Sequence, residues 1–152
     1  FIGMQERFIH ARSPEANNMK VLGPLWGRFL PVYQRIPNRV NEHCYGVIEK
    51  RPEAERQHPD ELLYIAGVEA TSADDVPDTM VARVVPSLTY AVFTHVGPIE
   101  NILRTINAAY EDWLPNSEYE HSGIADIELY DERFRPGTPE CTMEYWISVE
   151  KK

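Results

Sequence analysis

A glutamate beside a tryptophan is the pairing in this sequence that most directly suggests chemistry. The segment TMEYWISVE (142–150) has the composition of a β-strand, and a strand turns alternate side chains to opposite faces. Glu144, Trp146 and Ser148 therefore share one face, while the other face has the apolar composition of a core. A carboxylate on a partly enclosed face is costly unless it is paired or solvated, so Glu144 is a candidate ligand for a cation.

Aromatic residues elsewhere are candidate contacts for the same ligand. Tyr130 and Glu128 are two residues apart in the strand segment IELYD, so both side chains are expected on the same strand face, toward a ligand-binding cleft. Trp26 flanks the apolar stripe of a helix, and Tyr90 and Phe93 lie on opposite faces of one strand, so one of those two should point at the cleft. The predicted ligand-binding residues are Glu144, Trp146, Tyr130, Trp26, Tyr90 and Phe93.

Other kinds of site find little support in the sequence. His43 and Cys44 are adjacent but lack metal-ligand spacing, so no metal is expected. The chain has no G-x-S-x-G, phosphate loop or glycine-rich dinucleotide motif, and no cofactor is expected. A net charge of −9 argues against direct nucleic-acid contact, because phosphate binding needs clustered lysine and arginine.

The cellular setting is predicted from equally simple features. Two cysteines, Cys44 and Cys141, make no disulfide framework, so reduced thiols and a cytoplasmic protein are expected. No apolar run approaches the roughly 20 residues that span a bilayer, and the start of the chain lacks a signal-peptide pattern. We therefore expect no membrane association.

Two helical segments must position these residues. The first is predicted over 14–35, with an interruption at Gly23-Pro24, and its apolar stripe has 3-4-3 spacing. The second is predicted over 98–114, because Gly97-Pro98 places proline at the first helical position. Strands are predicted at 5–11, 43–49, 62–70, 80–85, 88–96, 125–131 and 142–150.

An offset of 81 residues relates the two halves of the chain. It aligns the apolar stripes of the two helices and places YIAGVE (64–69) on YWISVE (145–150), which indicates an internal duplication. The same offset aligns Glu144 with Leu63. The predicted fold is α+β, built from tandem β-α-β-β modules at about 4–70 and 80–151 within a single domain over 1–152. Their antiparallel sheets are expected to enclose a central cleft on the faces that the helices leave free.

Several of these segments together resemble a known family. GPLWGRF, YAVFTHVGPIENI, YEDWLPNSEYE, IELYDERF and MEYWISVEKK are similar, in order and spacing, to the bacterial GyrI-like small-molecule-binding domain, also called the transcription-activator effector-binding domain. The similarity runs from about Met4 to Lys151 and departs at Ser148, where the family commonly has proline. The resemblance implies two SHS2-type modules around a cleft in which Glu144 and aromatic residues recognise lipophilic, often cationic, compounds.

The resemblance leaves three functions open. As a binding module, the domain captures a drug-like compound, either to sequester it or to signal to a DNA-binding domain located before Phe1 or on a partner chain. As an enzyme, it hydrolyses cyclopropane-bearing genotoxins, with Glu144 acting on water or on the opening ring and Tyr130 donating a proton. As a protein–protein adaptor or inhibitor, it docks through its acidic surface. Binding is the function we favour.

Overall fold

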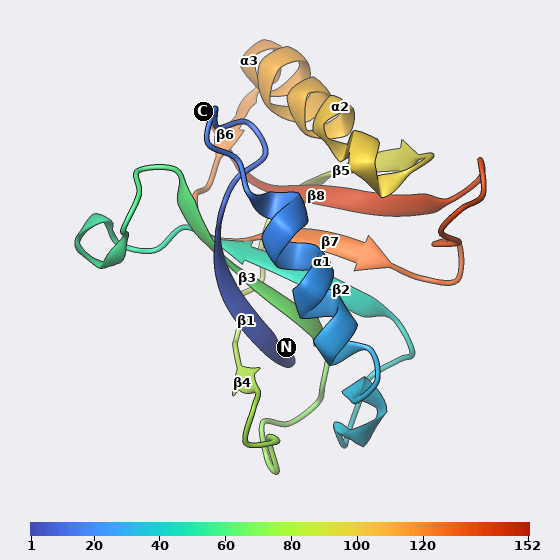
Figure 1. The fold of residues 1–152 in the computed structure, drawn as a ribbon. Coiled ribbons are helices and arrows are strands. Elements are labelled where there is room, and N and C mark those ends of the chain that lie inside the picture. The colour runs from blue at the N-terminus through green and yellow to red at the C-terminus, as the bar shows by residue number, and fades with distance from the viewer.

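Eight strands form one continuous sheet in the computed structural model, which describes all residues from Phe1 to Lys152 (Figure 1). The strand order is β4-β1-β3-β2-β7-β8-β5, with β6 also paired to β8, and every pairing is antiparallel. The strands are β1 (Ile2–Ile9), β2 (Cys44–Glu49), β3 (Glu61–Val68), β4 (Val81–Ala82), β5 (Thr89–Val96), β6 (Tyr119–His121), β7 (Asp126–Tyr130) and β8 (Thr142–Lys151).

Each half of the chain contributes three strands to this sheet and helical structure that packs on it. The first half forms β1, α1 (Asn18–Phe29), β2 and β3, and the second forms β5, α2 (Ile102–Asn107), β7 and β8. The halves meet where β2 pairs with β7, so the order β1-β3-β2 on one side is mirrored by β5-β8-β7 on the other. The predicted α+β fold with two β-α-β-β units is confirmed. β4 is shorter than predicted, and β6 was not predicted.

The first helix is shorter than the sequence pattern indicates. α1 continues through Pro24 but ends at Phe29, and a separate 3₁₀ turn follows at Tyr33–Arg35. Pro31 lies in the gap and lacks an amide hydrogen for a helical bond. Leu25 and Phe29 are the buried residues of α1 and pack it against the sheet.

The second helical run changes its geometry three times. A 3₁₀ turn at Ile99–Asn101 leads into α2, which continues as a π-helical turn at Ala108–Trp113 and ends in α3 (Leu114–Asn116). The run therefore covers the predicted span and extends slightly beyond it. None of the helices in the chain combines the length and apolar character that crossing a bilayer requires.

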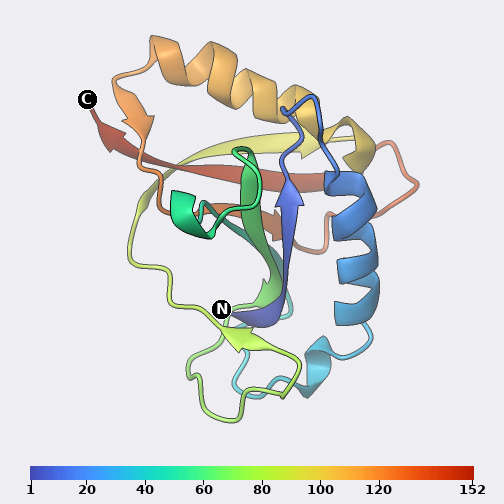
Figure 2. The same ribbon diagram turned by 60° about the vertical axis from the view of Figure 1, so that its left-hand side comes forward.

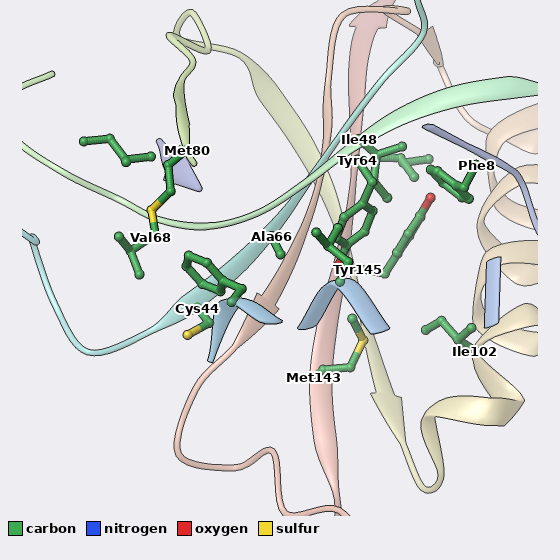
Figure 3. Packing of buried hydrophobic residues seen from close by; sticks show 14 of the residues in the cluster. Phe8, Cys44, Ile48, Tyr64, Ala66, Val68, Met80, Ile102, Met143 and Tyr145 are labelled. Atoms are coloured by element: carbon green, nitrogen blue, oxygen red, sulfur yellow. The ribbon is translucent and has the colours of Figure 1, made fainter. Parts of the chain in front are cut away.

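Both helices pack on the same face of the sheet. Leu25 of α1 and Ile102 of α2 belong to one large buried cluster with Tyr64 of β3 and Tyr145 of β8, and Figure 3 shows Ile102, Tyr64 and Tyr145 within that cluster. The opposite face carries a smaller cluster that includes Val47 and Ile127. Figure 2 shows that the two ends of the sheet cross steeply, which is the accumulated twist of neighbouring strands.

The location of the cleft differs from the prediction. The two units join edge to edge through β2 and β7 instead of facing each other, so no cleft forms between faces without helices. Because α1 and α2 lie over different strands of one face, the space between them is enclosed by both helices and the sheet. The core face and the face that carries the cavity are therefore the same.

Candidate functional site

A cavity of about 810 Å³ lies between the helices and the sheet. This volume is within the range of roughly 300–1,000 Å³ that small-molecule sites occupy. Seventeen of its 30 lining residues are hydrophobic, which favours a lipophilic occupant. Trp26 of α1, Tyr64 of β3, Tyr130 of β7 and Tyr145 of β8 bring aromatic rings to the wall from four separate elements.

Glu128 is the carboxylate at the centre of this wall. It lies on β7 with 7% of its surface exposed. The Tyr64 hydroxyl donates to its Oε2 at 2.5 Å, and the Tyr130 hydroxyl donates to the same oxygen at 2.9 Å. Its other oxygen, Oε1, accepts no hydrogen bond from the protein, and an ionised carboxylate accepts bonds at both oxygens. Glu128 therefore keeps capacity for an electrostatic partner in the cavity.

A short hydrogen-bonded chain fixes the aromatic wall around Glu128. Trp26 Nε1 donates to the Tyr64 hydroxyl at 3.0 Å, and that hydroxyl in turn donates to Glu128. The Trp26 ring also meets the Tyr130 ring edge-on at 5.3 Å between centroids. The indole and both phenols are thereby held in place by contacts to one another, so the aromatic part of the cavity wall is preformed.

Gly46 makes room for this arrangement. It lies opposite Glu128 in the β2–β7 pairing and opposite Ala66 in the β2–β3 pairing. A Cβ atom at this position would lie 2.2 Å from the Tyr64 hydroxyl oxygen and 2.7 Å from Glu128 Oε2. Any side chain on this residue would occupy the space of the Tyr64–Glu128 hydrogen bond.

Burial controls the ionisation of the Glu128 carboxyl group. Burial raises the pKa of Glu128 above its ordinary value, although the hydrogen bonds from Tyr64 and Tyr130 oppose the change by stabilising the carboxylate. Burial, together with the nearby Glu128 charge, also raises the pKa values of Tyr64 and Tyr130. Both phenols therefore stay protonated near neutral pH and act as donors to Glu128.

A second buried carboxylate, Asp126, faces the cavity but is saturated by protein donors. Its Oδ1 accepts from the Ser148 amide at 2.8 Å, the Ser148 hydroxyl at 3.2 Å and His121 Nε2 at 2.9 Å. Its Oδ2 accepts from the Tyr110 hydroxyl, whose ring lines the cavity. Asp126 thus positions Tyr110. Serine at 148 matters here, because proline at that position could not donate the amide bond.

The structure places Glu144 outside the cavity. Its strand face is the one opposite to the helices, where it accepts 2.8 Å hydrogen bonds from Arg133 and from Trp146 Nε1 and stays 20% exposed. Trp146 packs against Tyr90 on that same outer face. The expectation that Glu144 faces the cleft is therefore corrected: its charge is balanced by Arg133 and solvent on the outer face.

The remaining candidates divide between the two faces. Trp26 and Tyr130 line the cavity, whereas Glu144, Trp146, Tyr90 and Phe93 do not. Phe93 is on the helix-bearing side but packs edge-on against Trp113, with centroids 5.6 Å apart. Glu128 is not among the predicted ligand-binding residues, although its alternation with Tyr130 in IELYD places both on one strand face.

A family model and a curated protein match most of this chain. The model of the GyrI-like small molecule binding domain matches residues 7–150. The transcriptional regulator BrlR of Pseudomonas aeruginosa is 34% identical over 130 residues, which cover 84% of this chain. The chain spans 46% of the length of that curated relative.

Solved structures share the fold. SAV2435 bound to tetraphenylphosphonium aligns with a TM-score of 0.67 and 18% identity, covering 98% of this chain and 87% of that one. EcmrR in its DNA complex aligns with a TM-score of 0.61 and 15% identity, covering 99% of this chain but 53% of that one. The integron cassette protein VCH_CASS2 of Vibrio cholerae aligns with a TM-score of 0.62 and 18% identity, covering 98% of this chain and 88% of that one.

Proposed function

The chain belongs to the GyrI-like small-molecule-binding domain family, and on that premise we propose that its cavity captures lipophilic organic cations with Glu128 as the counter-charge. The observation that carries this proposal is the buried Glu128 carboxylate, which is held by two tyrosine hydroxyls and leaves one oxygen without a protein donor. Glu144, the carboxylate expected from the sequence, has no place in this proposal because it does not line the cavity.

The wall and the charge favour the same class of compound. Apolar surface contributes about 25 cal/mol for each Å² that a ligand buries, without requiring a strict orientation. Aromatic faces such as Trp26 and Tyr130 add about 0.5–2 kcal/mol for a delocalised cation. A buried carboxylate selects for positive charge and leaves the shape open. Together these terms support binding of many different lipophilic cations, which is a multidrug-type function.

The compartment and the wider protein follow as part of the proposal. Both cysteines are free and buried, as expected for thiols kept reduced in the cytoplasm.

The related proteins include the transcriptional regulator BrlR, of which this chain spans 46%. We infer that ligand capture here serves regulation of transcription through a DNA-binding segment outside these residues, and that this domain itself makes no contact with nucleic acid.

A matched pair of ions tests the charge preference. Tetraphenylphosphonium and tetraphenylborate have nearly the same shape and opposite charge, so the difference in their affinities isolates the charge that the cavity prefers. Isothermal titration of the purified chain should show the cation binding at least about tenfold more tightly, equivalent to roughly 1.4 kcal/mol. Equal affinities, or preference for the anion, would overturn the proposal.

A further inference from the structure

The cavity has chemically different ends, which the pairing of β2 with β7 defines. Cys44 lies opposite Tyr130 at one end, and Ile48 lies opposite Asp126 at the other, with Glu128 between them. All five side chains line the cavity. The strand axis therefore runs along the cavity, and residues that follow either strand mark its two mouths.

One mouth is acidic. Glu42 precedes β2, and Asp131 and Glu132 follow β7, so all three lie at the Cys44–Tyr130 end and line the cavity. Arg39 pairs with Glu42 at 3.3 Å and Arg133 pairs with Asp131 at 2.7 Å, and neither arginine lines the cavity. Glu132 lies 3.6 Å from His43, which does line it. No lysine or arginine lines this mouth.

The opposite mouth holds both basic side chains of the lining. Lys50 directly follows β2, two residues beyond Ile48 on the same strand face, and Arg12 comes from the loop after β1. His10 lines the same mouth. Lys50 is exposed and makes no salt bridge or hydrogen bond within the chain. Three nitrogen-bearing side chains from two segments therefore lie at the end of the cavity opposite to the acidic mouth.

Two carboxylates lie beside these groups. Asp60 also lines the cavity and lies 3.7 Å from His10 Nε2, whereas Glu111 does not line it and lies 3.3 Å from Arg12 Nη2. The Arg12 guanidinium also lies over the Tyr110 ring, 5.3 Å from its centroid, which holds it at the cavity wall.

The charges around His10 act together. Burial lowers the pKa of His10, Asp60 opposes this change, and the charges of Arg12 and Lys50 lower it further. His10 is therefore neutral near pH 7 and offers a hydrogen bond beside the two cations. All three side chains line the cavity.

We propose that the Lys50–Arg12 mouth is a subsite for an acidic group, so that the natural ligand is a lipophilic zwitterion. Resting on the proposed function, this assignment puts the aromatic cation of the ligand beside Glu128 and its carboxylate, or an equivalent acidic group, beside Lys50 and Arg12. Lys50 lies four strand residues from Gly46, the partner of Glu128, which corresponds to about 13 Å along the strand. The flexible lysine side chain shortens that span, so the two charges suit one drug-sized molecule.

Two fluorescent dyes that differ by one methyl group test the subsite. Rhodamine 110 is a zwitterion with a free carboxylate, and rhodamine 123 is its methyl ester and carries positive charge alone. Fluorescence anisotropy would measure both affinities for the unmodified chain, for Arg12→Gln/Lys50→Gln, and for the control Lys20→Gln/Arg104→Gln. The control removes two exposed cations that do not line the cavity.

The unmodified chain and the control should bind the zwitterion about tenfold more tightly than the ester, and Arg12→Gln/Lys50→Gln should reduce that ratio to about one. Ester affinity should be retained in all three proteins.

A ratio of zwitterion to ester affinity that the Arg12→Gln/Lys50→Gln change leaves unaltered would overturn the subsite. A chain that binds tetraphenylphosphonium but shows no preference for the zwitterion would overturn the subsite alone. Failure to bind tetraphenylphosphonium as well as both dyes would count against the proposed function itself.

Discussion

The Tyr64 hydroxyl donates a 2.5 Å hydrogen bond to the Glu128 carboxylate, and the two residues come from different halves of the chain. β3 supplies the donor and β7 the acceptor, with β2 running between them in the sheet. The position of the cavity-facing carboxylate therefore depends on the joining of the two units. A perturbation of β2 should change the cavity as well as the stability of the fold.

Gly46→Ala tests that dependence. The new methyl group would lie 2.2 Å from the Tyr64 oxygen, so the hydrogen bond to Glu128 must break or β2 must shift. We expect a loss of stability of about 1–3 kcal/mol, as for other overpacked sites, together with weaker binding of tetraphenylphosphonium. Chemical denaturation and calorimetric titration measure the two effects.

Gly27→Ala is the matched control for that change. Gly27 lies within α1, and a Cβ atom there would meet nothing within 4 Å. Alanine is the better helix former by about 0.5–1 kcal/mol, so this variant should be slightly more stable and bind normally. If Gly46→Ala were as harmless as Gly27→Ala, the close packing around Glu128 would be refuted.

Binding of a cation should release a proton over a defined pH range. The pKa of Glu128 is raised in the free protein, so part of the population stays protonated at pH values above the ordinary pKa of glutamate. A bound cation favours the carboxylate and lowers that pKa, so affinity should rise as pH increases through the pKa of the free protein and then level off. Calorimetry in two buffers of different ionisation enthalpy measures the proton directly. The number released should be the same in Glu144→Gln and should fall to zero in Glu128→Gln.

Ligand binding should be reported by one tryptophan of the three. Trp26 lines the cavity, whereas Trp113 and Trp146 do not. An aromatic cation should therefore quench the fluorescence of the unmodified chain, of Trp113→Phe and of Trp146→Phe, but leave Trp26→Phe nearly unaffected. Quenching that followed Trp146 instead would place the ligand on the outer face of the sheet, beside Glu144.

The fold could be predicted from the sequence because its signals are local and repeated. Apolar stripes, strand alternation and the duplication at one offset identify the two β-α-β-β units. β6 has three residues and β4 has two, and such short strands leave little pattern to detect. The joining of the units through β2 and β7 depends on strand pairing between distant segments, which alternation within one strand does not specify.

The site was harder to predict, because a shift of one residue in the alignment of a strand turns all its side chains to the opposite face of the sheet. The constant offset of 81 aligns Glu128 with Val47, but Val47 faces the outer side and Glu128 faces the cavity. The structural correspondence between β2 and β7 therefore differs from the offset of 81 by an odd number of residues. Between β3 and β8 the offset of 81 holds, and Glu144 shares the outer face with its equivalent, Leu63. Glu144 is a charged residue in a largely apolar strand, a pattern that predicts a ligand contact, but Arg133 balances that charge.

The most direct test compares two substitutions of the same kind on neighbouring strands. Glu128→Gln and Glu144→Gln each remove one carboxylate, from the cavity face of β7 and the outer face of β8 respectively. Calorimetric titration with tetraphenylphosphonium should show affinity reduced by about tenfold or more in Glu128→Gln, roughly 1.4 kcal/mol, and unchanged in Glu144→Gln. Unchanged affinity in Glu128→Gln, with a loss in Glu144→Gln, would contradict the assignment of the binding carboxylate to the cavity.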